Sequence, residues 1–372
     1  MCRFFEILLM QGGKIMTTIR SIYGCILCLA TISCIGLLTS VSAGAGNNLD
    51  TFWKVEGDLI GKKKKGKKKK SEDVSGIACA TDRGFPRTCL LIDDELQVAQ
   101  VVIVQEGSLL AGGPVPLIDD TFDGEPVEFD GEGVAYADGE FLVIGSHGHP
   151  RDQDNELDPD NDADEIRASI TANSRIIRVR IDPGTVAPDG KLRVKAETKA
   201  FTDLRAILAD EPLLAPFVDR RLDQNGLTIE GIAVVGETLY VGLRAPSLGG
   251  DRAAIVSMAV KAFLDGGKPK PQLHLVPLGP GRGVRDLAAS PSGLLVLAGP
   301  AAATDGPYSI YRVKGDDAVL LGDVPPLVQK GEAVKPEALL FLNEDQNGQR
   351  VLVLSDGAKN GAPRELRIRR VP

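Results

Sequence analysis

The chain has 372 residues, of which 43% are hydrophobic and 25% charged, so it is long enough for one large domain or two smaller ones. Its net charge of −8 argues against a nucleic-acid-binding protein, because such proteins need clustered positive charge to pair with phosphates. Only 5% of the residues are aromatic and a single Trp is present, which excludes propellers whose repeats each carry a Trp-Asp pair.

The first 43 residues have the pattern of an export signal. An apolar run spans residues 22–38, and Val41, Ser42 and Ala43 fit the small-residue motif before a cleavage site. We therefore expect residues 1–43 to be removed and the mature protein to be periplasmic or extracellular, with Met16 as an alternative start of translation. The other interpretation is a retained membrane anchor, since the run is near the minimum length that spans a bilayer.

Residues 44–72 link this signal to the folded part of the chain. Residues 51–60 are weakly strand-like, and we expect them to pair with residues 365–371, so that a strand from one terminus completes the blade at the other. Residues 62–70 contain eight lysines and are predicted to be disordered, because like charges repel. This lysine segment is interpreted as a solvated linker or, alternatively, as a basic arm that contacts anionic surfaces.

The folded part begins with a hairpin, residues 73–95, that contains the last two cysteines. Four of the six cysteines precede residue 44, which leaves Cys79 and Cys89 on opposite arms of this hairpin. Cross-strand neighbours are close enough for a disulfide bond, and exported proteins fold in an oxidising compartment. We predict a disulfide between Cys79 and Cys89, with two buried thiols as the alternative.

Residues 130–149 predict a second hairpin. Apolar runs at residues 133–136 and 141–144 flank an Asp-Gly turn, in which glycine supplies the positive φ that a tight hairpin requires. An antiparallel hairpin brings the start of its first strand and the end of its second strand to the same edge. Glu132 and His147 are therefore expected to lie at one rim.

The stretch between the second and third hairpins is the longest. Residues 151–165 are acidic, with aspartates that alternate as in a Ca²⁺ loop, but Ala163 replaces the glycine that such loops need. A solvated acidic loop is the preferred interpretation. Residues 174–181 and 192–201 alternate as strands, and residues 202–222 are predicted to be partly helical.

Three further hairpins repeat the pattern, at residues 229–246, 285–300 and 336–357. Repetition of one all-β unit is typical of a β-propeller. We predict a single all-β propeller over residues 73–372, with four-stranded antiparallel blades and one short helical insertion. Five blades are favoured over six, because the acidic loop and the helical segment account for the long interval. The protein is expected to be a monomer.

Charged residues at the ends of these hairpins are predicted to converge at one rim of the central channel. Converging carboxylates must be neutralised by protonation, by arginine or lysine, or by a cation. The candidate metal ligands are Glu132, Glu230, Asp286 and Glu337. The candidate groups that bind a small ligand are Arg244, Arg285 and Asp356, and His147 is a candidate base or metal ligand. Oxygen ligands favour Ca²⁺ over Mg²⁺ or Zn²⁺ at this rim.

Four blocks of sequence also carry a resemblance to a known family. In order, they are GEGVAYADGEFLVIGSHG, LTIEGIAVVGETLYVGLRAP, LGPGRGVRDLAASPSGLLVLAGP and PEALLFLNEDQNGQRVLVLSDG. With a looser first block, they resemble an uncharacterised bacterial family, the domain of unknown function 3616, over roughly residues 73–357. The resemblance implies an exported, propeller-like protein and no established reaction. The glutamates that open the inner strands are also similar to those of phytase-like and lactonase-like propellers, where axial carboxylates hold a divalent cation.

Two functions fit these observations. The first is an exported propeller whose acidic rim binds a divalent cation and a small anionic or sugar-like ligand, and which as an enzyme would be a metal-dependent hydrolase. The second is a non-catalytic interaction or scaffold protein whose rim carboxylates form structural salt bridges. The expected partners are a small molecule or a surface polymer, with residues 62–70 contacting anionic surfaces, and nucleic acid is not expected.

Overall fold

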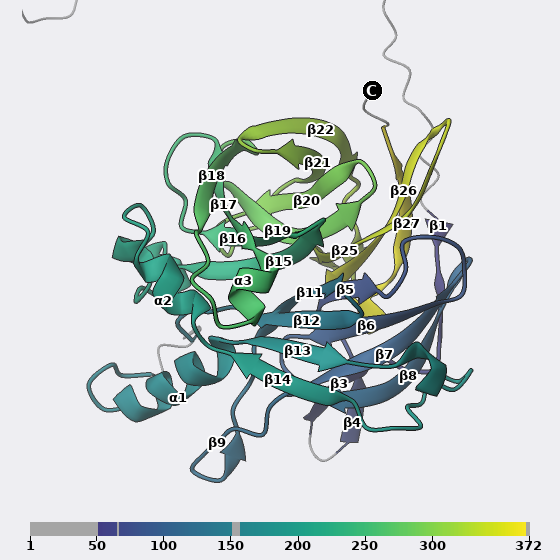
Figure 1. Ribbon diagram of the computed structural model, residues 1–372, viewed down its shortest axis with the longest axis horizontal. Coiled ribbons are helices and arrows are strands. Elements are labelled where there is room, and N and C mark those ends of the chain that lie inside the picture. The colour runs from purple at the N-terminus through teal and green to yellow at the C-terminus, as the bar shows by residue number, and fades with distance from the viewer. Residues whose placement is uncertain (1–50, 65–66, 151–156, 370–372) are drawn as a thin grey trace, which may run out of the picture. The chain divides into compact units, whose positions relative to one another are not determined.

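Five antiparallel sheets of four strands, one of them extended by a fifth strand, form the blades of a β-propeller, as predicted (Figure 1). This computed structural model describes residues 51–64, 67–150 and 157–369, and the predicted export signal, residues 1–43, lies outside them. The described residues belong to one compact unit, Asn47–Pro372.

The blades are numbered here in chain order. Blade 1 consists of β5 (Val74–Cys79), β6 (Arg87–Asp93), β7 (Val98–Gln105) and β8 (Ser108–Pro116). Blade 2 consists of β11 (Gly131–Ala137), β12 (Glu140–Gly145), β13 (Ile176–Arg180) and β14 (Glu197–Phe201). Blade 3 consists of β15 (Thr228–Val235), β16 (Thr238–Ala245), β17 (Arg252–Ala259) and β18 (Gln272–Pro277). Blade 4 consists of β19 (Arg282–Ser290), β20 (Gly293–Pro300), β21 (Tyr308–Lys314) and β22 (Asp317–Val324). Blade 5 consists of β25 (Lys335–Asp345), β26 (Gly348–Asp356), β27 (Arg364–Ile368) and β1 (Thr51–Phe52).

The first strand of each chain-ordered blade lies at the centre of the propeller. Figure 1 shows β5, β11, β15, β19 and β25 gathered there, and each contacts the next in a closed cycle. Small residues allow this close approach: a Cβ added to Gly76 would lie 2.7 Å from the Cα of Gly133 on the neighbouring blade. A side chain at Gly76 would therefore push blades 1 and 2 apart.

The hydrophobic core is divided into five clusters, one at each interface between neighbouring blades. Strand β12 shows how alternation produces this division. Leu142 and Ile144 pack in the cluster shared with blade 3, whereas Phe141 and Val143 pack in the cluster shared with blade 1. Because both faces of such a strand are buried, its sequence is a continuous apolar run rather than an alternation of apolar and polar residues.

The N-terminal segment closes the ring between blades 5 and 1. Strand β1 pairs antiparallel with β27, and β2 (Lys54–Glu56) pairs parallel with β8, the outer strand of blade 1. Trp53 is the residue between β1 and β2 in the chain. Its side chain donates a hydrogen bond to Glu365, with 3.1 Å between Nε1 and Oε2. The predicted pairing with the C-terminal strand is confirmed, and the pairing with blade 1 is an additional tie.

In the part of the chain that the structure describes, three α-helices lie outside the blades: α1 (Ala163–Asn173), α2 (Leu204–Ala209) and α3 (Val260–Leu264). The predicted helical insertion at residues 202–222 is confirmed by α2 and the following 3₁₀ turns, and the described part of the long interval contains no sixth blade. Within the described residues, no helix combines the length and apolarity that crossing a membrane requires.

Helix α1 occupies part of the stretch that was expected to be an acidic loop. The side chain of Asp158 accepts hydrogen bonds from the backbone N–H groups of Asp160 (2.8 Å) and Asn161 (3.3 Å), and that of Asp162 accepts one from Asp158 (2.7 Å). These aspartates therefore satisfy backbone donors at the entry to a helix, as acidic and amide side chains commonly do. Residues 151–156 of the predicted loop lie outside the described part.

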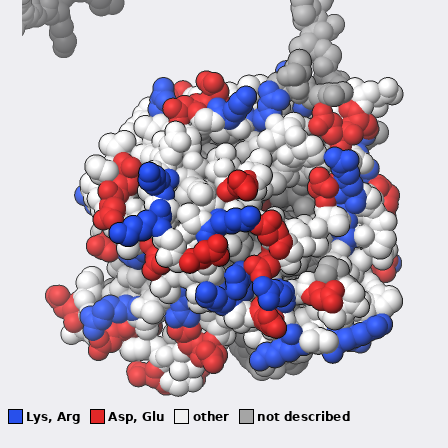
Figure 2. Space-filling view, viewed as in Figure 1, with Lys and Arg blue, Asp and Glu red and all other residues white. Residues whose placement is uncertain are grey.

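The prediction that the lysine segment is disordered is wrong for its described part. Strands β3 (Ile60–Lys64) and β4 (Lys67–Lys70) form an antiparallel hairpin, in which Lys62 forms an ion pair with Glu128 and Lys70 forms one with Asp58. Carboxylates from neighbouring segments thus offset part of the repulsion between lysines, which the composition of the run does not reveal. On the face shown in Figure 2, basic and acidic side chains are likewise interspersed.

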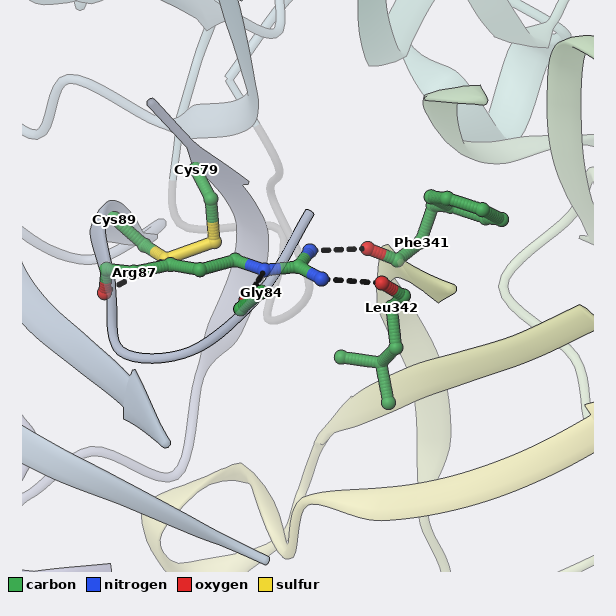
Figure 3. Close-up of a disulfide and its surroundings, with 6 residues drawn as sticks. All are labelled: Cys79, Gly84, Arg87, Cys89, Phe341 and Leu342. Atoms are coloured by element: carbon green, nitrogen blue, oxygen red, sulfur yellow. Dashed lines mark hydrogen bonds between the residues drawn. A yellow bond between two sulfur atoms is a disulfide. The ribbon is translucent and has the colours of Figure 1, made fainter. Parts of the chain in front are cut away.

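A second tie between blades 1 and 5 is the side chain of Arg87 (Figure 3). The predicted disulfide between Cys79 and Cys89 is present and closes the loop from which Arg87 extends. The guanidinium donates hydrogen bonds to the carbonyls of Phe341 (3.0 Å) and Leu342 on β25 of blade 5. Because Arg87 is only 1% exposed, it supplies hydrogen bonds where water is excluded.

Replacing Arg87 with Met is expected to lower the free energy of unfolding by about 3 kcal/mol, because two buried carbonyls lose a charged donor. Urea denaturation followed by circular dichroism measures this change. Arg83→Met is the matched control, since the Arg83 side chain on the same loop is 84% exposed. Equal losses of stability in the two variants would contradict the role assigned to Arg87.

Candidate functional site

The pairing of each inner strand with the second strand of its blade is irregular near its start, and the residue skipped there is polar in every blade. These residues are Ser75, Glu132, Glu230, Arg285 and Glu337. In blade 3 the irregularity also skips Arg244 on the second strand, and in blade 5 a second shift skips Leu342. All five are buried. Since a bulge re-aims a side chain relative to the regular alternation, the bulges place one buried polar group per blade at the same level of the channel.

The sequence assigned this position in blade 4 to Asp286, and the structure assigns it to Arg285. Asp286 is the residue directly after Arg285, and blades 1 to 3 have a glycine at the corresponding position. Its Oδ1 accepts a hydrogen bond from the N–H of Leu287 (2.7 Å), and its Oδ2 accepts one from Leu339 (2.6 Å) on the inner strand of blade 5. Burial raises the pKa of Asp286 well above its ordinary value, against the effect of these two donors. The Asp286 carboxylate therefore links two strands and is not grouped with the other predicted metal ligands.

Glu230 and Glu337 are held by arginines. Arg244 Nη1 lies 2.7 Å from Glu230 Oε1, Arg285 Nε lies 3.0 Å from Glu230 Oε2, and Arg285 also forms an ion pair with Glu337. All four side chains are buried, so loss of any one would strand a charge in the interior. At these two glutamates the geometry is that of structural salt bridges, the alternative considered from the sequence.

Glu132 is the predicted metal ligand that the structure brings into a carboxylate cluster. One oxygen from each of Asp94, Asp130 and Glu132 lies within 4.8 Å of the others. Oxygen ligands on opposite sides of a Ca²⁺ ion, each about 2.4 Å from it, have this separation. Asp94 and Asp130 are not among the metal ligands predicted from the sequence. The cluster brings together the end of a blade 1 strand and the start of a blade 2 strand. The pairing of strands within one hairpin does not predict such a contact between two blades.

A cavity of about 370 Å³ lies at this cluster. Its charged lining residues are six carboxylates and one lysine: Asp73, Asp94, Glu95, Glu128, Asp130, Asp356 and Lys335. We call it the acidic cavity. Lys335 lies 2.9 Å from Asp356. Lys62 of the lysine segment forms an ion pair with Glu128, which lines the cavity. The excess of negative charge in a concave site favours a bound cation.

Asp93 directly precedes Asp94 in the chain, and its side chain is buried. Burial raises the pKa of Asp93 to about 8, although the hydroxyl of Ser71 donates to its carboxylate at 2.6 Å. Nearby Asp73 and Glu95 raise it further. Asp93 is therefore mostly protonated at neutral pH and does not add a full negative charge to the cluster.

The structure does not bring His147 together with the carboxylates. Its Nδ1 lies 2.9 Å from the carbonyl oxygen of Gly145, so Nδ1 carries the proton. Its Nε2 is buried without a hydrogen-bond partner in the described part of the chain. Burial lowers the pKa of His147 to about 4, and the neighbouring Arg205 lowers it as well. The imidazole is thus neutral at pH 7 and enclosed.

A larger cavity of about 870 Å³ adjoins the acidic cavity, and Pro150 and Lys335 line both. We call it the arginine cavity, after its lining residues Arg221, Arg244 and Arg285. Two of the three predicted ligand-binding residues, Arg244 and Arg285, lie here, whereas Asp356 lines the acidic cavity.

His147 makes stability depend on pH. The unfolded chain takes up this proton near pH 6.5, whereas the folded protein does so only near pH 4, so acidification between these values favours unfolding. The contribution of neutral His147 is complete above pH 6.5 and is lost as the pH falls to 4, by about 3 kcal/mol. Replacing His147 with Asn, which tolerates the positive φ of 54° at this position, should remove that loss.

Urea denaturation at pH 7 and pH 4.5 compares His147→Asn with the wild type. Asp93 acts in the opposite direction, because its raised pKa favours the folded state at low pH, but it does so equally in both proteins. His149→Asn is the control and is expected to follow the wild type. An equal acid-induced loss in His147→Asn and wild type would contradict the assignment.

The chain was compared with known proteins. Residues 92–366 match the profile of a family described as a protein of unknown function, DUF3616. No curated protein matches the sequence. Similar solved structures include an exo-β-1,3-galactanase from Phanerochaete chrysosporium, with 9% identity over 87% of this chain and 67% of that chain and a TM-score of 0.44. They also include a putative 6-phosphogluconolactonase from Bacteroides uniformis, with 12% identity over 75% of this chain and 66% of that chain and a TM-score of 0.30.

The β-propeller domain of Nup133 from Vanderwaltozyma polyspora is a further similar structure, with 8% identity over 79% of this chain and 71% of that chain and a TM-score of 0.31. The chain spans about two thirds of the length of the galactanase and lactonase chains. Likeness at these identities concerns the fold and carries no argument about activity.

Proposed function

Because the chain belongs to DUF3616, a family of proteins of unknown function, we propose a function from its own residues: the acidic cavity binds a divalent cation. The observation that carries this proposal is the convergence of Asp94, Asp130 and Glu132, whose oxygens lie within 4.8 Å of one another. The surrounding carboxylates of the cavity add attraction for a cation.

The donor set favours Ca²⁺. The cluster offers only carboxylate oxygens, and His147, the nitrogen ligand that made Zn²⁺ a candidate, lies elsewhere. Ca²⁺ accepts six to eight oxygens in flexible geometry, which suits a cavity with further carboxylates at its wall, whereas Mg²⁺ requires a stricter octahedron. In this proposal the protein is exported, as its N-terminal residues predict. Extracellular Ca²⁺ modules bind with a Kd on the order of 10⁻⁴ M.

Binding is better supported than hydrolysis. A metal-dependent hydrolase needs a proton acceptor beside the cation, and the predicted base, His147, is enclosed away from the cluster. The scaffold alternative is supported at another part of the rim, where Glu230 and Glu337 pair with arginines. We therefore propose a cation-binding propeller whose rim is structural in blades 3 to 5 and binds the ion between blades 1 and 2.

Isothermal titration calorimetry with Ca²⁺, Mg²⁺ and Zn²⁺ tests the proposal on the purified protein. Glu132→Gln removes one charged ligand at nearly constant volume and should weaken Ca²⁺ binding at least about tenfold. Glu237→Gln, at an exposed turn, should leave the affinity unchanged. Glu230→Gln should lower stability but leave the Ca²⁺ affinity within about twofold, since Glu230 contacts arginines. No heat of binding in the wild type, or equal affinity in Glu132→Gln, would remove the site.

Lys62 provides a second test, because its ammonium pairs with Glu128 at the cavity wall and competes with a bound cation. Lys62→Gln should raise the Ca²⁺ affinity by about two- to fivefold, the range expected for an exposed ion pair. The effect should shrink in high salt. Lys54→Gln, which removes an exposed lysine paired with Glu56, is the matched control. Equal affinities of the Lys62→Gln and Lys54→Gln variants would show that Lys62 does not compete for the site.

A further inference from the structure

The arginine cavity is not explained by cation binding. Its volume of about 870 Å³ falls within the range of small-molecule sites, roughly 300–1,000 Å³. It shares Pro150 and Lys335 with the acidic cavity, so a molecule bound here would lie beside the cation site. Its lining comes from blades 3, 4 and 5 and from the segments that precede blade 3.

The two central arginines of this cavity are already neutralised. Arg244 and Arg285 share Glu230, and Arg285 also contacts Glu337. Arg244 donates its remaining hydrogen bonds to the carbonyls of Ala301 (3.0 Å) and Ala302 (3.1 Å). An anion that bound these guanidinium groups would have to compete with buried carboxylates and backbone oxygens. The expectation that Arg244 and Arg285 hold an anionic ligand is therefore not favoured by the geometry.

The charges at the edge of the cavity are balanced in the same way. Arg221 lies 2.5 Å from Asp223, and Lys335 lies 2.9 Å from Asp356. Asp305 is exposed and adds a further negative charge to the lining. The cavity thus has no excess of positive charge, which disfavours a phosphate or carboxylate ligand.

The remaining polar groups both donate and accept hydrogen bonds. The phenol of Tyr308 lines the cavity, and its hydroxyl makes no hydrogen bond within the described residues. Burial raises the pKa of Tyr308, so the hydroxyl stays protonated and can act as donor and acceptor. Hydroxyls of Ser247 and Thr304 and the carboxylate of Asp305 lie in the same lining. Such a mixture suits a ligand with many hydroxyl groups and leaves an apolar ligand with unsatisfied polar neighbours.

We propose that the arginine cavity binds a neutral, polyhydroxylated small molecule of the size of a mono- or disaccharide. Hydroxyl groups match the mixed donors and acceptors, and their neutrality matches the balanced charge. The apolar walls at Leu222, Ala245 and Ala301 contact the C–H faces of a sugar ring. This binding adds an organic ligand to the cation of the proposed function and does not require it.

Saturation-transfer difference NMR on the full protein tests the inference with glucose, galactose and maltose, each with EDTA and with Ca²⁺. The matched anionic probes are glucuronate, galacturonate and glucose 6-phosphate. At least one neutral sugar should receive saturation in EDTA, with a Kd at or below the millimolar range. Its anionic counterpart should bind several-fold more weakly. Absence of signal from all neutral sugars, or preference for the anionic probes, would overturn the inference.

Tyr308→Phe should weaken sugar binding about tenfold, because it removes one hydrogen bond of about 1.4 kcal/mol at nearly constant shape. Tyr240→Phe, on β16 and outside the cavity, is the matched control, and thermal melts establish that both variants are folded. Equal affinity in the two variants would place the sugar elsewhere and overturn the inference. Ca²⁺ binding without sugar binding would leave the proposed function intact, whereas sugar binding in EDTA without Ca²⁺ binding would support the inference alone.

Discussion

An irregularity in strand pairing near the start of each inner strand decides which side chains meet at the axis of this propeller. The bulges bury Ser75, Glu132, Glu230, Arg285 and Glu337 together. Charges buried so close to one another must balance, because the interior does not screen them. Arg285, with Arg244 from the second strand of blade 3, balances Glu230 and Glu337. Glu132 instead meets Asp94 and Asp130, so carboxylate groups accumulate between blades 1 and 2.

The same architecture therefore supports two kinds of chemistry on one rim. In blade 3 the second strand, β16, carries Arg244 next to its last residue, and this arginine forms a salt bridge with Glu230. In blade 5 Glu337 pairs instead with Arg285 from the inner strand of blade 4. In blades 1 and 2 the second strands end at Asp93 and Gly145, which supply no cation. The difference arises from whether an arginine lies beside the glutamate, and it separates the acidic cavity from the neutral arginine cavity beside it. A ligand that enters between them meets the carboxylates of the proposed cation site on one side and the hydroxyl groups of the arginine cavity on the other.

Features set by short-range geometry could be predicted from the sequence. The Asp138-Gly139 turn has positive φ at both residues, and Cys79 pairs with Cys89 across the first hairpin. Features set by packing between blades could not. A bulge shifts the register by one residue without an unambiguous sequence signal, so Asp286 was taken for Arg285. His147 does lie at the end of its strand, but Arg205 from α2, distant in the sequence, donates to its carbonyl and lowers the pKa of its imidazole.

The acidic cavity keeps its shape only while the ring of blades stays closed. The acidic cavity takes Asp94 from blade 1 and Asp130 from the start of blade 2, while Lys335 and Asp356 come from blade 5. Its walls keep their spacing only if blades 5 and 1 stay joined. That junction is made by β1 and β2, which pair with β27 and β8, and by Arg87, which donates to β25. These ties lie at the outer edge and in the interior rather than at the rim, so the carboxylates of the rim do not have to hold the ring together. Because closure is secured elsewhere, the rim can keep an excess of like charge that would otherwise push the blades apart.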